Sequence, residues 1–242
     1  MANRQRAEAR KKAAAKAARQ GGLNRNTWIL IGVVVALIAG GVIFAVTRNG
    51  SSSAPPVDSG SSTTVASGTP DSMPVTVTGT ALPAFDETKT VDPAVGMVAP
   101  TLDGFNFSRQ PLRVDATKGA YMLVFLAHWC PHCNAEVPRL NAWKLSGAVP
   151  ANLSVIGVAT AVSKTSANYP PGPWISGKGW TWPSMIDEYK GDAAAGTAAQ
   201  AYGASGWPYF VIVGADGKVK VRVSGEVAVT DLQKIVDAAL KA

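Results

Sequence analysis

The chain has 242 residues, of which 47% are hydrophobic, so it is long and apolar enough for one large or two small domains. Its net charge of +7 is confined to residues 1–26, which carry eight Lys/Arg and one acid, whereas residues 27–242 carry fifteen charges of each sign. A folded part without net charge excludes a broad cationic surface for phosphates, and we expect no nucleic-acid partner.

Residues 1–26 form an Ala/Lys/Arg-rich tail without a strong apolar face, which is typical of a solvated arm rather than of a partner-binding helix. The next segment, TWILIGVVVALIAGGVIFAV (27–46), carries no charge, and as a helix it would span about 30 Å of hydrocarbon. A buried core helix and a cleaved signal peptide are the alternatives. A signal peptide usually has a shorter apolar region of about 7–15 residues and a small-residue cleavage site, which FAVTRNG does not provide. We therefore predict an uncleaved transmembrane helix over 27–46.

The distribution of positive charge predicts the orientation of this helix. Eight Lys/Arg precede the apolar segment and only Arg48 closely follows it, so the tail is expected in the cytoplasm and the rest of the chain outside it. Residues 47–74 are rich in Ser, Gly, Thr and Pro, which is typical of a flexible linker. Residues 75–242 have the pattern of a globular domain.

Strands and helices alternate in that domain, which predicts an α/β fold with a mixed central sheet flanked by helices. The segment between 163 and 183 contains three Trp and no expected element; it either shapes a partner surface or covers the core. In chain order we expect an edge strand (75–80), a hairpin turning at Asp103-Gly104 (99–108), a central strand covered on both faces (121–127), a helix (130–145), a buried strand (152–160), an Ala-rich helix ending at Gly203 (191–203), a hairpin turning at Asp216-Gly217 (208–223), and an amphipathic helix capped by Thr230 (230–242).

Both cysteines and both histidines of the chain lie within six residues, from His128 to Cys133. Cys130 falls where the buried strand ends and the helix begins, and Cys133 lies one turn further, near enough for a disulfide. The positive end of the helix stabilises a thiolate at Cys130, which is the nucleophilic form, and a protonated His132 adds to this effect. The pattern predicts that Cys130 exchanges disulfides, that Cys133 resolves the mixed disulfide and that His132 tunes the potential.

Other roles for these residues are open to test. A structural disulfide between the two cysteines would close a loop of only four residues, worth about 2 kcal/mol. A zinc site would need ligands beyond one C-x-x-C pair. Delivery of copper by the same two thiols is a further alternative. His128 is expected to be an exposed residue at the strand end rather than a catalyst.

The stretch FLAHWCPHCNAEVP (125–138) resembles the active-site segment of the thioredoxin superfamily. More narrowly it resembles the TlpA/ResA-like branch of membrane-anchored extracytoplasmic proteins, through EVP (136–138), APTLDG (99–104) and AQAYGASGWPYFVIVGADGKV (199–219). The resemblance covers roughly residues 96–242. It implies a thioredoxin-like fold and a thiol–disulfide oxidoreductase that needs no cofactor and no bound metal.

The resemblance also implies roles for particular residues. Trp207 and a cis Pro208 would form a shelf for the substrate chain beside Cys130, with Trp129 next to it; an ordinary turn proline is the alternative for Pro208. Glu136 would carry a proton to or from Cys133, and the alternative for it is a solvated helix acid.

Two directions of electron flow compete. The Pro-His centre of the C-x-x-C motif resembles the oxidising DsbA-type enzymes, whereas the TlpA/ResA branch favours reduction, for example of haem-binding cysteines during cytochrome c maturation. We expect an oxidant of exported proteins. Its partners would be protein thiols and disulfides outside the cytoplasm, a membrane redox partner and the lipid bilayer. A metal-binding module or copper chaperone is the alternative from a different class.

Overall fold

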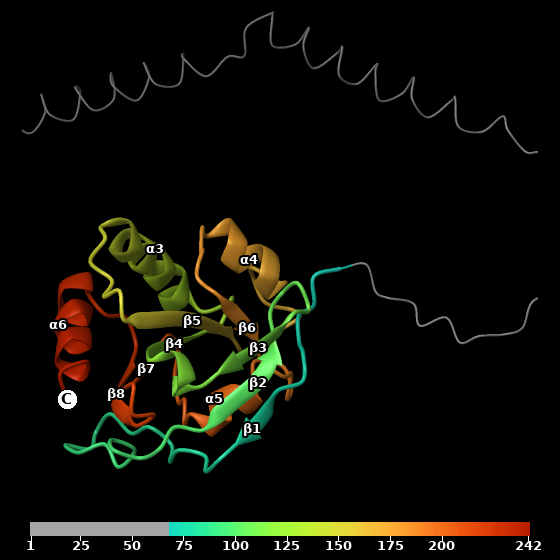
Figure 1. The fold of residues 1–242 in the computed structure, drawn as a ribbon. Coiled ribbons are helices and arrows are strands. Elements are labelled where there is room, and N and C mark those ends of the chain that lie inside the picture. The colour runs from blue at the N-terminus through green and yellow to red at the C-terminus, as the bar shows by residue number, and fades with distance from the viewer. Residues whose placement is uncertain (1–67) are drawn as a thin grey trace, which may run out of the picture. The chain divides into compact units, whose positions relative to one another are not determined.

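The computed structural model describes residues 68–242 (Figure 1). The predicted basic tail, the transmembrane helix and most of the linker lie outside these residues. Within the described part, no helix is long and apolar enough to cross a bilayer.

The described part contains eight strands, four α-helices and one short 3-10 helix, which alternate as the sequence pattern predicts. The strands are β1 (Thr76–Thr78), β2 (Thr101–Phe105), β3 (Pro111–Val114), β4 (Ala120–Leu126), β5 (Leu153–Ala159), β6 (Ser184–Ile186), β7 (Tyr209–Val213) and β8 (Val219–Ser224). The helices are η1 (Ala116–Lys118, 3-10), α3 (Pro131–Leu145), α4 (Pro171–Gly177), α5 (Thr197–Ala201) and α6 (Val229–Ala239).

All eight strands belong to one mixed sheet in the order β1-β2-β6-β5-β4-β7-β8, with β3 paired to β2. β4 lies at its centre, parallel to β5 and antiparallel to β7, so that Leu123 faces Ile156 on one side and Val211 on the other. The predicted mixed sheet is therefore confirmed. A short turn separates the end of β4 from the start of α3. The C-x-x-C motif at this turn therefore lies at one end of the central strand.

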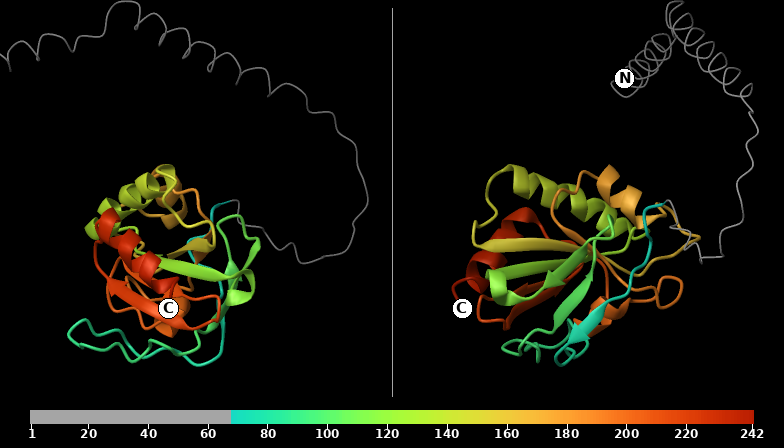
Figure 2. Two further views of the ribbon diagram at one scale, coloured as in Figure 1. Left: turned by 60° about the vertical axis from the view of Figure 1, so that its left-hand side comes forward. Right: turned by 45° about the vertical axis from the view of Figure 1, so that its right-hand side comes forward.

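Helices cover both faces of the sheet, with α3 and α4 on one side and α5 on the other (Figure 1, Figure 2). Every residue of β4 is buried, and its side chains alternate between two apolar clusters. Met122 and Val124 pack with residues of α3, α4 and α6, whereas Leu123 and Phe125 pack with residues of α5. This confirms the central strand covered on both faces, and it explains why the whole segment is apolar rather than alternating.

The first expected hairpin is present, but its turn is not at Asp103-Gly104. Both residues lie inside β2, where a Cβ on Gly104 would lie 3.1 Å from the sulfur of Met185. Glycine is therefore used here for close approach to β6 rather than for a turn. The chain reverses at 106–110, where the Asn106 side chain accepts two backbone N–H bonds within the turn, each of 2.9 Å.

Three helix predictions need correction. The expected Ala-rich helix is only α5, because the buried carboxylate of Asp187 accepts the N–H groups of Ala198 and Ala199 and fixes its start there. α6 begins at Val229, so Thr230 lies in its first turn and Ala228 is the N-cap. α4 lies in the Trp-rich segment 163–183, for which no element was expected, and β6 follows directly after it. α4 starts after Pro170, whose peptide bond with Tyr169 is cis.

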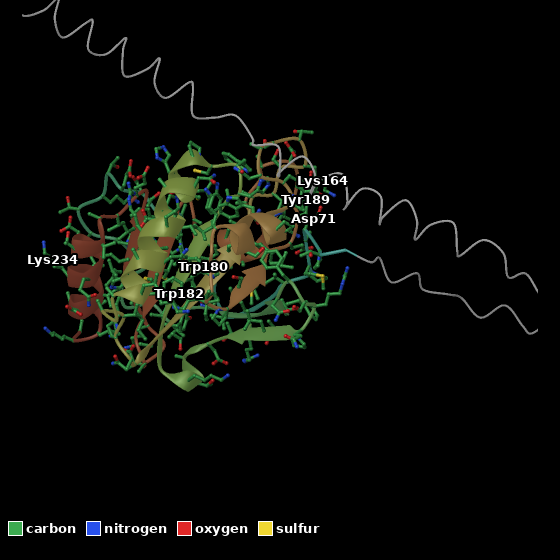
Figure 3. The ribbon with its side chains drawn as sticks, turned by 90° about the horizontal axis from the view of Figure 1, so that it is seen from above. Asp71, Lys164, Trp180, Trp182, Tyr189 and Lys234 are labelled. Carbon is green, nitrogen blue, oxygen red and sulfur yellow. The ribbon has the colours of Figure 1, made fainter. Side chains whose placement is uncertain are left out.

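Residues 68–73, at the end of the predicted linker, lie against two loops of the domain (Figure 3). The carboxylate of Asp71 accepts a hydrogen bond from the Tyr169 hydroxyl (2.5 Å) and lies 3.5 Å from the ammonium of Lys164, which sits over the ring of Tyr189. The backbone N–H of Met73 donates to the Asp187 carbonyl (3.4 Å). These contacts hold the chain entering the domain beside the loop 161–169.

Candidate active site

Cys130 stands at the junction of strand and helix that the sequence predicts. β4 ends at Leu126, a tight turn follows in which the Cys130 N–H donates to the Ala127 carbonyl (3.1 Å), and Cys130 is the N-cap of α3. Pro131 occupies the first helical position, where a missing N–H costs nothing. The free N–H groups of the first helical turn are therefore next to the Cys130 sulfur.

The two sulfurs are both free thiols, but their surroundings differ. Cys130 retains 5% of its surface, and its thiol donates to the backbone carbonyl of Trp207 at 3.5 Å. Cys133 is completely buried, and its sulfur accepts the N–H of Ala127 at 3.4 Å. Burial raises the pKa of the Cys133 thiol, and the neighbouring Cys130 and the charge of Glu136 raise it further. Cys133 is thus a fully buried, protonated thiol, whereas Cys130 keeps a small exposed fraction.

Trp207 lies beside Cys130, and the predicted cis bond between Trp207 and Pro208 is confirmed. The carbonyl of Pro208 accepts the N–H of Gly225 (2.8 Å), which connects Pro208 to the loop after β8. Trp129, on the other side of Cys130, is half-buried and donates its indole N–H to the Ala161 carbonyl (2.6 Å). Both aromatic residues predicted near Cys130, Trp129 and Trp207, therefore lie next to it.

Glu136 is fully buried in α3, so the alternative of a solvated helix acid is wrong. Its Oε2 accepts N–H bonds from Arg139 (3.1 Å) and from the backbone of Val227 (3.2 Å), whereas its Oε1 has no hydrogen-bond partner among the described residues. Burial raises the pKa of this carboxyl, and the donors only partly offset that effect. A buried acid with an open oxygen, within electrostatic range of Cys133, is equipped to take up or release a proton.

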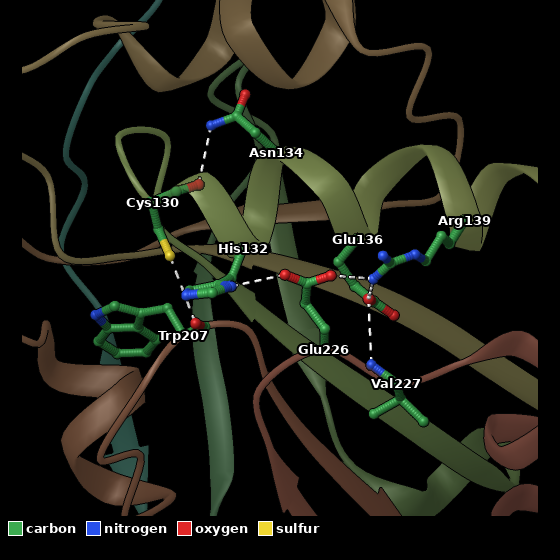
Figure 4. A network of polar contacts seen from close by, with 8 residues as sticks. All are labelled: Cys130, His132, Asn134, Glu136, Arg139, Trp207, Glu226 and Val227. Atoms are coloured by element: carbon green, nitrogen blue, oxygen red, sulfur yellow. Dashed lines mark hydrogen bonds and ion pairs between the residues drawn. The ribbon is translucent and has the colours of Figure 1, made fainter.

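His132 points outward from the first turn of α3, with 64% of its side chain exposed. Its Nδ1 lies 2.6 Å from Oε1 of Glu226, which follows β8, and the other oxygen of Glu226 contacts Arg139 (Figure 4). Hydrogen bonds from His132 and Arg139 lower the pKa of Glu226. Sequence reasoning missed Glu226, because no local pattern marks a single acid 94 residues from His132 as its neighbour.

Residues 95–222, just over half of the chain, match the AhpC/TSA family. The chain belongs to the AhpC/TSA family. This confirms the resemblance to the thioredoxin superfamily, the thioredoxin-like α/β fold and the prediction of a thioredoxin-like oxidoreductase. No match was found among curated proteins.

Several solved structures are similar to this AhpC/TSA family protein. A hypothetical protein from Sinorhizobium meliloti 1021 is 17% identical over 67% of this chain and 88% of its own, with a TM-score of 0.50. A thiol:disulfide interchange protein of the thioredoxin family from Chlorobium tepidum TLS is 22% identical over 60% of this chain and 96% of its own, with a TM-score of 0.47. StoA from Bacillus subtilis is 16% identical over 60% of this chain and 99% of its own, with a TM-score of 0.46.

His128 of this AhpC/TSA family protein is buried, which corrects the expectation of an exposed strand-end residue. Its Nε2 accepts the backbone N–H of Ser163 (3.2 Å), so the proton is on Nδ1, which donates to the Ala167 carbonyl (2.9 Å). Burial lowers the pKa of His128 and keeps the ring neutral. Its role is to hold the loop 161–168 against the active site, which only the folded chain reveals.

The part of the AhpC/TSA family protein that the structure describes contains no group of three or more His, Cys, Asp or Glu side chains placed to hold a metal ion. The sulfurs of Cys130 and Cys133 are the only thiols of the whole chain. Chemically, the arrangement offers a dithiol in which Cys130 is nearly buried and Cys133 completely buried, together with a buried acid.

Proposed function

We propose that this protein is a thiol–disulfide oxidoreductase that oxidises protein thiols through the Cys130–Cys133 pair. The observation that carries the proposal is the unequal placement of the two sulfurs. Cys130 caps a helix and touches the backbone carbonyl of Trp207, whereas Cys133 is sealed beneath it. Cys130 is thus positioned to bond to a substrate sulfur, and Cys133 to leave from Cys130 or to return to it.

In the oxidising direction, the reaction starts from the Cys130–Cys133 disulfide. A substrate thiolate attacks the Cys130 sulfur, a substrate–Cys130 bond forms, and Cys133 leaves as a thiolate that takes up a proton. A second substrate thiolate then attacks the substrate sulfur of this mixed disulfide and releases Cys130 as a thiolate. The substrate loses two electrons and gains a disulfide, and the Cys130–Cys133 pair is reduced.

The buried acid handles the proton at Cys133 in this proposal. Cys133 is completely buried, and its raised pKa requires a proton as soon as its sulfur leaves. Glu136 is the acid whose charge acts on Cys133, and its Oε1 makes no hydrogen bond within the described residues. In its protonated form Glu136 supplies that proton, and in its ionised form it accepts one when the reaction runs in reverse.

The proposal places this chemistry outside the cytoplasm, on a domain tethered to a membrane. The uncharged segment 27–46, the basic tail before it and the Ser/Gly/Pro-rich linker after it support this placement. A membrane redox partner would then reoxidise the reduced pair, because extracytoplasmic compartments keep disulfides oxidised.

Equilibration of the full-length protein with glutathione tests the direction of electron flow. An oxidant is expected at a reduction potential of about −180 to −120 mV, above the glutathione poise of the cytoplasm. A potential near about −270 mV, as in reducing thioredoxins, would favour the reductase alternative. Stoichiometric zinc or copper on the reduced protein, without any exchange, would contradict the oxidoreductase and favour a metal-binding module.

A further inference from the structure

Residues 68–73, at the end of the predicted linker, form an entry segment that is fixed to the domain at several points. The hydroxyl of Ser72 accepts the backbone N–H of Tyr189 (2.7 Å). The methyl group of Thr69 packs against the start of α4, where a Cβ on Gly172 would lie only 2.5 Å from it. A glycine at this helix position therefore leaves room for the entry segment.

Asp71 connects the entry segment to the loop 161–169. The hydroxyl of Tyr169 donates to the Asp71 carboxylate (2.5 Å), and the ammonium of Lys164 lies 3.5 Å from the same oxygen (Figure 3). The side chain of Lys164 is 54% exposed, so its ion pair with Asp71 contributes little in water. The hydrogen bond from Tyr169 is thus the main link between Asp71 and the loop.

The other side of the loop 161–169 holds the turn that carries Trp129. The carbonyl of Ala161 accepts the indole N–H of Trp129 (2.6 Å). The side-chain amide of Asn168 donates to the carbonyl of His128 (3.0 Å), which belongs to the peptide bond directly before Trp129. Both the ring of Trp129 and its backbone are therefore placed by this loop.

The loop has a conformation that depends on such contacts. Ala161 and Asn168 have φ values of 49° and 64°, in the left-handed region that residues other than glycine seldom adopt. Residues in this region persist only where their surroundings hold them. Tyr169 directly follows Asn168, and it contacts Asp71 through its hydroxyl and the ring of His128 through its own ring, with centroids 6.0 Å apart. Tyr169 thus connects Asp71 with the turn of the active site.

We propose that Asp71 is a positioning residue that, through Tyr169, holds the loop 161–169 and so keeps Trp129 in place as one wall of a polypeptide-binding site beside Cys130. The inference rests on the proposed function. It makes the end of the linker a structural part of the active site. Within the described part of the chain, the hydrogen bonds of Asp71 and Tyr169 do not reach a thiol, so they act on substrate binding rather than on the dithiol–disulfide equilibrium.

The test is the oxidation of a synthetic peptide with two thiols by the oxidised full-length protein in a single turnover. The maximal rate and the peptide concentration at half-maximal rate are measured separately. We expect Asp71→Ala to raise the half-saturating concentration about three- to tenfold, the effect of one lost hydrogen bond, with the maximal rate changed by less than about twofold. The equilibrium constant K for reduction of the protein by glutathione should stay unchanged.

Three further variants identify the contact that matters. Tyr169→Phe keeps the ring against His128 but loses the hydroxyl, so it should match Asp71→Ala, and the double variant should show no further rise. Asp71→Asn keeps an acceptor for the hydroxyl and should remain close to wild type. Asp86→Ala is the matched control, because its carboxylate accepts the hydroxyl of Thr88 instead (2.6 Å).

The outcomes separate this inference from the proposed function. A shared rise in Asp71→Ala and Tyr169→Phe, with K unchanged, supports the inference. An unchanged half-saturating concentration in Asp71→Ala, an equal rise in Asp71→Asn or in Asp86→Ala, or a changed K overturns it. A wild-type protein that oxidises no peptide would contradict the proposed function itself, and the inference would fall with it.

Discussion

Glu136→Gln should change how the stability of the protein depends on pH. Burial raises the pKa of Glu136 above its ordinary value of 4.5, so the unfolded chain releases this proton at a lower pH than the native protein does. The favourable contribution of the protonated acid is complete below pH 4.5 and is lost as the pH rises through the raised pKa. Wild-type stability should therefore decline relative to the variant as the pH increases.

The size of the stability difference between wild type and Glu136→Gln follows from the titration of one proton and from the hydrogen bonds at Glu136. Across that pH window the difference in free energy of unfolding should change by up to about 1.4 kcal/mol per pH unit. The glutamine side chain in the Glu136→Gln variant would keep an oxygen for the N–H groups that Oε2 now accepts, and its amide N–H would replace the unpartnered Oε1. That unpaired donor adds a cost of about 1–3 kcal/mol that is the same at every pH.

Urea unfolding of the reduced wild-type and variant proteins at several pH values between about 4 and 8 measures this difference. Subtraction cancels the other buried groups, including Asp187 and His128. Glu188→Gln is the control with the opposite sign: hydrogen bonds from Thr197 and Lys190 lower the pKa of Glu188, so its contribution is lost as the pH falls. A difference between wild type and Glu136→Gln that does not vary with pH would refute the reasoning.

Two further predictions concern the buried residues of the site. Limiting iodoacetamide at about pH 7 should alkylate Cys130 and spare Cys133, because Cys133 is fully buried with a raised pKa, and equal labelling of the native protein by mass spectrometry would contradict this. His128→Ala should cost about 2–4 kcal/mol in urea unfolding and speed tryptic cleavage after Lys164, because it removes two hydrogen bonds to the loop 161–168. The pKa of His128 is lowered, so its contribution to the free energy of unfolding is present above the ordinary value of 6.5 and is lost as the pH falls. A His128→Ala variant with unchanged stability and unchanged cleavage would show that the loop does not depend on His128.

Local sequence patterns predicted the parts of the site that depend on neighbouring residues. An apolar run followed by Cys-Pro and helical spacing indicated the end of β4 and the start of α3, because a buried strand and a Pro at the first helical position are local features. The same logic failed for Asp103-Gly104, where a turn dipeptide is used inside a strand for close packing against Met185. A turn signal does not reveal which neighbour the backbone must approach.

The contacts that sequence reasoning missed all join distant segments. The burial of His128 depends on the loop 161–168, and Glu226 contacts His132 from the loop after β8. The cis bond at Pro208 was expected from a family resemblance, whereas the one at Pro170 had no such guide. Tertiary packing decides these features, and a single sequence carries no local mark of them.

Trapping of mixed disulfides by Cys133→Ala tests most directly whether Cys130 exchanges disulfides with protein substrates. In cells that produce this variant, proteins should accumulate in covalent adducts that a reductant dissolves, and Cys130→Ala together with Cys133→Ala should abolish them. If Cys133→Ala collects no more adducts than the double variant, the account in which Cys130 forms mixed disulfides with protein substrates is wrong.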